Sequence, residues 1–226
     1  MRHVVIGCGG IGGWLIRGLV PSLSPADELV LVDGDTYEPR NLRRQGATAG
    51  SKAGAFEQVA QPYRVPTRVV RAYVTKVTGQ NAIAIDQLIR EGDTVWVCPD
   101  NHATRKLVLD FASNLADITV LLAGNDGLDG NILVYQRVGG KELTPHPYLR
   151  HPELKVRRAF KPPTPAEHQM SCQVQADQGD TQTVLANFQA AACLLMAHRA
   201  LTEGQRISEL YFDCAAMGLR KVEAPA

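Results

Sequence analysis

The residues with the clearest chemical meaning are three glycines, Gly7, Gly9 and Gly12. They form a G-x-G-x-x-G pattern directly after the apolar run at residues 4–6. Glycines let the backbone turn sharply and approach phosphate oxygens closely. The first N–H groups of a helix have no partner within it, so these groups and the positive end of the helix dipole attract an anion. The spacing therefore predicts a phosphate-binding turn that leads into a helix near Gly10.

A single acid completes a nucleotide-binding pattern. Asp33 follows a second apolar run at residues 29–32, and it lies about 20 residues beyond the glycines, where an acid can hold the hydroxyls of a ribose. Strand, glycine turn, helix, strand and acid in this order are the context that a nucleotide-binding βαβ unit requires. We therefore predict that this chain binds a nucleotide.

A dense polar and basic group follows Asp33, where residues 33–45 read DGDTYEPRNLRRQ. Several cations and an amide suit a triphosphate, whose charge must be neutralised before an anionic nucleophile can approach. A solvated surface loop is the alternative interpretation of the same residues. The candidate nucleotide-binding residues of this stretch are Asp35, Asn41, Arg44, Gln45 and, a few residues later, Lys52.

Another polar group follows a buried apolar run at residues 94–98. It consists of Asp100 and Asn101, with Arg105 shortly after them. Ligands of open α/β sheets bind beyond the carboxyl ends of the strands, so Asp100 is expected at the same edge as the glycine turn. A carboxylate beside bound phosphates can hold Mg²⁺, which takes one or two protein carboxylates and keeps several waters. Asp100 or Asn101 can also cap the helix that begins near Ala103, and the two roles are compatible.

The elements that must position these residues alternate along the chain. We predict strands near residues 3–7, 29–33, 94–98 and 118–123, helices near 11–20, 51–61, 81–90 and 103–115, and a β-rich stretch at 68–74. Ser51 is the expected N-cap of the second helix and Pro62 its end. The alternation predicts an α/β, Rossmann-like fold, with a mainly parallel sheet and helices on both faces.

The pattern changes beyond residue 130. A hairpin closed by Gly139 and Gly140 predicts an antiparallel extension of the sheet. Residues 142–182 lose the apolar periodicity and contain six of the thirteen prolines, and a stretch of this kind is usually a functional loop. We expect it to cross over the site. An apolar helix at 183–201 and a last short strand at 210–212 complete a single domain over residues 1–226.

Composition excludes several classes of protein. The 226 residues are 45% hydrophobic, with a net charge of +1, so they can form a sizeable core and give no reason to expect a nucleic-acid partner. The glycines interrupt the N-terminal apolar run, which argues against a signal peptide, and no stretch reaches the ~20 apolar residues of a membrane span. Five cysteines without close pairs indicate a reduced, cytoplasmic protein without a disulfide framework.

These motifs together resemble the E1-like adenylyltransferases, the ThiF/MoeB/HesA group. The resemblance covers about residues 1–125, and its most specific part is Asn-Leu-x-Arg-Gln after Asp-x-Asp. It implies ATP- and Mg²⁺-dependent adenylation of the C-terminal carboxylate of a ubiquitin-like or sulfur-carrier protein. It further implies that Asp33 holds the ribose, that Asn41, Arg44 and Lys52 handle phosphates, and that Asp100 binds the metal. The matching residues are Gly7, Gly9, Gly10, Gly12, Asp33, Asp35, Asn41, Leu42, Arg44, Gln45, Lys52, Asp100, Asn101 and Arg105.

The chain departs from the family pattern in several places. The segment between Gln45 and Lys52 is shorter than usual, and Val97 stands where an acid is common. The two C-x-x-C zinc pairs of many members are absent, so no structural zinc is expected. Relatives are commonly dimers in which an N-terminal helix sends an arginine into the neighbouring site. This sequence starts at the first strand, so any arginine acting in this way is expected from elsewhere, or there is none.

Cys172 lies in the sequence QMSCQ, between the proline-rich stretch and the late apolar helix. Some family members carry an acyl-accepting cysteine at a similar place, so the resemblance implies that Cys172 could receive the activated carboxylate. An incidental surface thiol is the alternative. Cys98 and Cys193 lie in apolar runs and Cys8 lies in the glycine turn, so we expect all three to be packed.

Two other functions stay open. An NAD-dependent oxidoreductase would use the same glycines and Asp33, but it leaves Arg44, Lys52 and Asp100 unexplained. A nucleotide-binding scaffold without catalysis would be consistent with the short segment before Lys52 and with the missing N-terminal helix.

Overall fold

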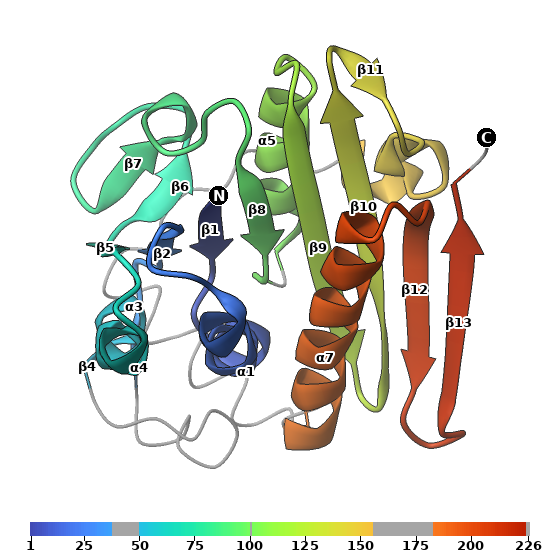
Figure 1. Ribbon diagram of the computed structural model, residues 1–226, viewed down its shortest axis with the longest axis horizontal. Coiled ribbons are helices and arrows are strands. Elements are labelled where there is room, and N and C mark those ends of the chain that lie inside the picture. The colour runs from blue at the N-terminus through green and yellow to red at the C-terminus, as the bar shows by residue number, and fades with distance from the viewer. Residues whose placement is uncertain (38–49, 100, 156–182, 225–226) are drawn as a thin grey trace.

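The computed structural model describes residues 1–37, 50–99, 101–155 and 183–224. Within them a mixed sheet of nine strands runs in the order β13-β12-β10-β9-β8-β1-β2-β5, with β11 beside β10 (Figure 1). Neighbours in β5-β2-β1-β8-β9 are parallel, and all other pairs in the sheet are antiparallel. The predicted α/β fold with an antiparallel C-terminal extension is confirmed.

The strands of the parallel half are β1 (Arg2–Ile6), β2 (Glu28–Val32), β5 (Thr67–Val70), β8 (Thr94–Val97) and β9 (Ile118–Asp126). The antiparallel half contains β10 (Asp129–Val138), β11 (Lys141–Glu142), β12 (Ile207–Asp213) and β13 (Gly218–Glu223). Two small sheets lie outside it: β3 (Thr36–Tyr37) pairs with β4 (Gly50–Ser51), and β6 (Tyr73–Thr75) pairs with β7 (Ala82–Ala84). The described α-helices are α1 (Gly10–Leu19), α3 (Lys52–Ala55), α4 (Glu57–Ala60), α5 (His102–Ala112) and α7 (Val184–Thr202).

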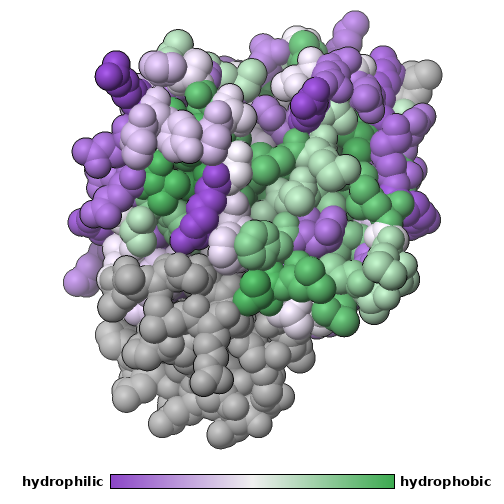
Figure 2. Space-filling model, turned by 60° about the horizontal axis from the view of Figure 1, so that its bottom comes forward, coloured by the Kyte–Doolittle hydropathy of each residue, from purple (hydrophilic) through white to green (hydrophobic). Residues whose placement is uncertain are grey.

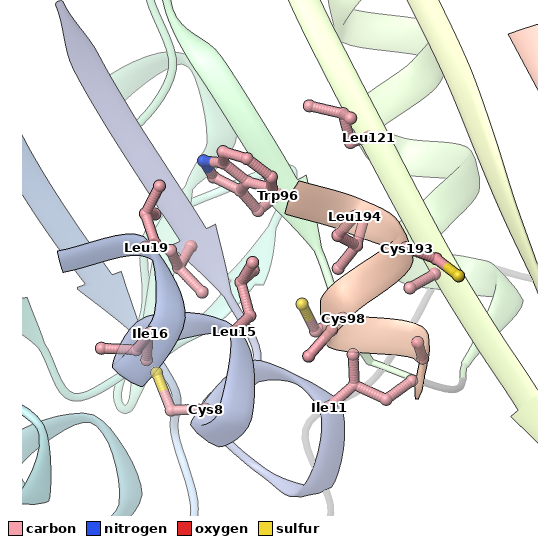
Figure 3. Packing of buried hydrophobic residues seen from close by; sticks show 14 of the residues in the cluster. Cys8, Ile11, Leu15, Ile16, Leu19, Trp96, Cys98, Leu121, Cys193 and Leu194 are labelled. Carbon is pink, nitrogen blue, oxygen red and sulfur yellow. The ribbon is translucent and has the colours of Figure 1, made fainter. Parts of the chain in front are cut away.

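The two faces of the sheet carry separate apolar layers. Side chains alternate between faces along a strand, so Val5 joins the layer of α1 and α7 whereas Val4 joins that of α5. In the first layer Leu15 of α1 and Leu194 of α7 pack near Trp96 of the sheet (Figure 3). Both faces are thus covered, which leaves the strand ends as the place where polar groups of the parallel half can meet a ligand.

Helix α7 corrects one expectation from composition. It is long and apolar enough to pass for a membrane-spanning helix, although no such stretch was expected. In the structure it packs against α1, β9, β10 and β12, and its small residues Ala186, Ala190 and Ala197 are fully buried. This packing accounts for the apolar residues on the inner face of α7, whereas Leu185, Phe188 and Met196 remain exposed.

The predicted helix at 81–90 is wrong. Residues 82–84 form β7, parallel to β6, and residues 85–87 form a 3-10 turn. The apolar residues that suggested a helical face, Ile83, Ile85, Leu88 and Ile89, are all buried, but a strand followed by a turn buries them equally well. Asn81 also adopts a positive φ of 55°, which does not fit inside a helix.

Three other parts of the structure differ from the elements predicted from the sequence. The helix expected at 51–61 is divided into α3, α4 and a 3-10 turn at Gln61–Tyr63, although Ser51 does cap it by accepting from the N–H of Gly54 at 3.2 Å. A further strand, β13, follows the strand expected to be last. The proposed crossover loop begins with two 3-10 turns, Pro147–Leu149 and Pro152–Lys155, and residues 156–182 lie outside the described part.

His3 gives the fold a predicted pH dependence. It is 2% exposed and accepts from the indole N–H of Trp96 at 3.3 Å through Nδ1. Burial, reinforced by nearby His198, lowers the pKa of His3 from 6.5 to about 4. His3 therefore binds a proton more readily in the unfolded chain than in the folded one. Its contribution to the free energy of unfolding is fully present above pH 6.5 and is lost as the pH drops towards 4, by up to about 3 kcal/mol. Urea unfolding at pH 7 and 4.5 should show this fall in wild type and a smaller one in His3→Gln; equal falls would contradict it.

Candidate active site

The glycine turn lies between β1 and α1. Gly7 has a positive φ of 85°, and its N–H donates to the carbonyl of Val32 at 2.8 Å, which ties the turn to the end of β2. Gly9 precedes the helix without a side-chain cap, and the first turn of α1 contains no acid. The helix begins at Gly10 as predicted, and its uncapped start is suited to an external anion.

The carboxyl group of Asp33 lies against this turn. Its Oδ2 accepts from the N–H of Cys8 at 2.7 Å and its Oδ1 from the N–H of Asp35 at 2.9 Å. Desolvation raises the pKa of Asp33, whereas the attraction of Lys52 and the two backbone donors lower it. A carboxylate can accept about four hydrogen bonds, so Asp33 retains capacity for ribose hydroxyls while it holds the turn and the end of β2 together.

Lys52 reaches the same acids despite the short segment before it. The pairing of β3 with β4 returns the chain to the end of β2, and the N–H of Lys52 donates to the carbonyl of Asp35 at 3.0 Å. Its ammonium group lies 3.1 Å from Oδ2 of Asp35. The side chain of Lys52 is only 15% exposed, so the cation is fixed beside Asp33 and the glycine turn.

The carboxyl end of β8 is braced by Arg105. This side chain is 8% exposed, and it donates to the carbonyls of Pro99 and Ala123 at 3.1 and 2.6 Å. Asn101 is the N-cap of α5, because its Oδ1 accepts from the N–H of Thr104 at 2.8 Å. Of the two predicted caps, the structure thus shows Asn101 in that role, and Arg105 holds the ends of β8 and β9 together.

A groove of about 700 Å³ extends from this edge over the antiparallel half of the sheet. It lies where β9 ends, β10 begins, β12 ends and α5 begins, and it is lined by Asn125, Asp126, Asp129, Asp213 and Arg220 among others. Its lining mixes these polar groups with apolar ones such as Phe212 and Leu219, as ligand-binding grooves commonly do.

The structure brings together part of the predicted set. The turn from Gly7 through Gly9 and Gly10 to Gly12 and the side chains of Asp33, Asp35 and Lys52 lie at one edge of the sheet. The other predicted site residues lie outside the described part, so their roles stay predictions: Asn41, Arg44, Gln45, Asp100 and Cys172.

The predicted packing of three cysteines is confirmed. Cys8 and Cys193 are fully buried and Cys98 is 8% exposed (Figure 3). Burial raises the pKa of the Cys98 thiol to about 12 and raises those of Cys8 and Cys193 as well. These thiols are therefore poor nucleophiles at neutral pH.

Three residues at the site were not predicted. The hydroxyl of Tyr73 donates to Oδ1 of Asp35, and that of Tyr37 donates to the carbonyl of Cys8 at 3.0 Å. Neither tyrosine has a local signal, because Tyr37 stands in a polar loop-like stretch and Tyr73 in an ordinary β-rich one. Asn187 of α7 packs against Gly10, and its signal was visible as an amide that interrupts an apolar helix.

Comparison with known proteins agrees with this geometry. The ThiF family matches residues 1–223. The cattle protein "Adenylyltransferase and sulfurtransferase MOCS3" is 32% identical over 86% of this chain and 39% of its own length. Its pig counterpart is 30% identical over 97% of this chain and 45% of its own length. The chain thus spans less than half the length of these relatives.

Among solved structures, E. coli MccB with MccA-N7isoASN has a TM-score of 0.69 at 17% identity, over 99% of this chain and 64% of that one. At this identity the likeness is one of fold. The motifs, the edge at which they gather and a match over residues 1–223 lead to the same conclusion: this chain belongs to the ThiF family.

Proposed function

We propose that this protein adenylates the C-terminal carboxylate of a small ubiquitin-like or sulfur-carrier protein, with ATP as the nucleotide and Mg²⁺ as the metal. The observation that carries the proposal is the meeting of the glycine turn, Asp33 and Lys52 at one edge of the sheet, beside a groove. The cattle and pig relatives carry adenylyltransferase in their names. Structures with the same fold hold MccB with ATP and with N-formylated MccA.

The described residues suit ATP better than a dinucleotide. The glycine turn and the uncapped start of α1 would provide the phosphate cradle, and Asp33, which lies against the turn, would hold the ribose. The partly buried ammonium group of Lys52, paired with Asp35, adds a positive group beside that cradle. A dehydrogenase has no need of such a cation, whereas neutralising a triphosphate requires several.

The metal would be held by Asp100. Its neighbours Pro99 and Asn101 stand at the carboxyl end of β8, next to the glycine turn that β1 leads into. A single carboxylate at that edge is the protein contribution that Mg²⁺ commonly takes when phosphates supply other ligands. When bound, the ion would offset the charge of the phosphates.

The adenylation step then depends mainly on how the protein positions ATP and the substrate carboxylate. An oxygen of the substrate carboxylate attacks the α-phosphorus, the new P–O bond forms, and the bond to the β-phosphate breaks to release pyrophosphate. The start of α1 and Lys52 neutralise charge on the phosphates, and the groove brings the carboxylate to them. Holding two anions in reach of each other accounts for much of the barrier reduction in reactions of this kind.

The substrate would be a protein with an extended C-terminal tail. The groove can receive such a tail, and exposed apolar side chains accompany it at the same end of the molecule (Figure 2). At the start of α7, Leu185 and Phe188 are 56% and 46% exposed. Exposed apolar groups gathered in this way are typical of surfaces that bind other proteins.

The central test is ATP–pyrophosphate exchange. With Mg²⁺ and a ubiquitin-fold protein ending in Gly-Gly, we expect labelled pyrophosphate to enter ATP only when all three components are present. Removal of the metal by chelation should stop the exchange. Binding of NAD without Mg²⁺, together with no measurable affinity for ATP, would instead favour an oxidoreductase. Binding of ATP without exchange would favour a scaffold.

Cys172 allows a prediction about the step after adenylation. We expect Cys172→Ala to keep full exchange and to lose a thiol-sensitive covalent adduct with the partner protein, because an acyl adenylate reacts readily with a thiolate. Cys214→Ala is the matched control, since Cys214 is the only described cysteine that is partly exposed. Gel shift with and without a reducing thiol measures the adduct. An adduct that persists in Cys172→Ala would assign the role to another cysteine.

A further inference from the structure

Asn187 is an amide buried at the junction of the glycine turn and the groove. It lies near the start of α7 and is 1% exposed. Its backbone N–H donates to the carbonyl of Thr183 at 3.2 Å, so the helix itself is satisfied. Its side-chain Oδ1 accepts from Nδ2 of Asn125, at the end of β9, at 3.1 Å. The hydrogen bond therefore joins α7 to the strand that borders the groove.

The other half of the amide packs against the glycine turn. A Cβ added to Gly10 would lie 2.6 Å from Nδ2 of Asn187, so the amide occupies the space that any larger residue at position 10 would need. This Nδ2 is buried and has no hydrogen-bond partner among the residues that the structure describes.

An unpartnered buried donor destabilises a fold by about 1–3 kcal/mol. An apolar residue at position 187 would avoid that penalty, and the other buried residues of α7 are apolar: Ala186, Ala190, Ala191, Cys193, Leu194 and Ala197. Stability of the core thus does not explain the amide. Unsatisfied polar groups that persist in this way are concentrated at functional sites, and here the amide adjoins one.

The effect of Asn187 is to orient Asn125. Asn125 lines the groove, and one N–H of its amide is committed to Asn187. This fixes the direction of the amide and leaves its Oδ1 and its second N–H for a ligand in the groove. An amide that offers one acceptor and one donor is complementary to a peptide group, which offers one of each.

We propose that Asn125 binds a peptide group of the substrate tail close to the reacting carboxylate, and that Asn187 is the positioning residue that sets the orientation of Asn125. The inference rests on the proposed function and names how its substrate is recognised. Recognition through the peptide backbone suits a tail that ends in glycines, because such a tail has no side chains to read. Contact of Asn187 with Gly10 then keeps the tail in register with the phosphate cradle.

The test is steady-state exchange with Mg-ATP and two probes: a ubiquitin-fold protein ending in Gly-Gly, and a heptapeptide with the same ending. We expect Asn125→Ala and Asn187→Ala each to raise the KM for either probe roughly 10-fold, the loss of about one hydrogen bond, with the KM for ATP changed less than about 3-fold. The double variant should be no worse than the more affected single one, because the two residues act as a unit. Gln189→Ala, which removes an amide from another face of α7, is the control and should match wild type.

A charge variant separates positioning from packing. Asn187→Asp keeps an oxygen that can accept from Asn125, so the KM for the probes should stay near the wild-type value. The added negative charge beside Gly10 should raise the KM for ATP roughly 10-fold by repelling phosphate. Melting temperatures of all variants are measured alongside, and Asn187→Ala is expected to melt no lower than wild type.

The outcomes distinguish the two levels of the proposal. If wild type exchanges with neither probe, the proposed function and this inference both fail. If wild type is active and the alanine variants raise both KM values equally, lower kcat alone or behave additively, only the inference is overturned. Selective loss of probe affinity in both single variants, with recovery in Asn187→Asp, supports it.

Discussion

Replacing Gly12 by alanine is expected to abolish nucleotide binding. A Cβ at this position would lie 1.8 Å from the carbonyl oxygen of Gly7 and 2.9 Å from its carbonyl carbon. Both atoms belong to the backbone of the turn, so the clash cannot be relieved by moving a side chain. The first turn of α1 must separate from the end of β1, which dismantles the phosphate cradle and removes more than about 3 kcal/mol of stability.

The measurement is ATP affinity by calorimetry, paired with thermal unfolding. Gly79→Ala is the matched control, because a Cβ there meets only Ala82, at 3.9 Å. It should bind ATP as wild type does. A Gly12→Ala protein that binds ATP normally would show that the phosphates do not depend on this turn.

Asp100→Asn is expected to reduce ATP–pyrophosphate exchange by roughly 100- to 1,000-fold or more, as losses of transition-state charge stabilisation do. The change removes one negative charge and leaves the size of the side chain nearly unchanged. Because Asn101 caps α5, Asp100 is not needed for that purpose, so the free energy of unfolding should change by less than about 1 kcal/mol.

The neighbouring residue provides the reciprocal control. Asn101→Ala removes the cap and should lower the free energy of unfolding by about 1 kcal/mol, while the affinity for Mg²⁺ stays near that of wild type. Exchange is assayed over a range of Mg²⁺ concentrations for both variants. If Asp100→Asn is fully active at low Mg²⁺, the metal is held elsewhere.

Local sequence was enough to predict the strand, glycine turn, helix and acid of the nucleotide-binding unit. Val4, Val5 and Ile6 are all buried in β1, as the apolar run directly before the glycine turn predicted. The glycines after them and Asp33 are then placed by the geometry of a tight turn and a parallel neighbour. These features depend on residues close together along the chain, so their spacing alone predicts them. Ser51 was predictable as a helix cap for the same reason.

Local sequence gave a wrong prediction where the spacing of apolar residues was the only indication of secondary structure. Ile83, Ile85, Leu88 and Ile89 have helical spacing, yet β6 is available as a pairing partner and the segment forms a strand and a turn. Which element buries such a short apolar run depends on what lies beside it. That neighbour is separated from the run by a loop, so periodicity cannot reveal it.

Only the tertiary structure decided how the remaining site residues act. Lys52 approaches Asp35 because the β3–β4 pairing returns the chain to the end of β2. Arg105 supports the strand ends through the carbonyls of Pro99 and Ala123 and also lines the groove. Asn187 contacts Gly10 and Asn125, residues distant from it in sequence. The sequence shows that these polar side chains are present. Their hydrogen-bond partners, however, depend on how separate elements pack against one another. The pattern within a single element therefore cannot predict those partners.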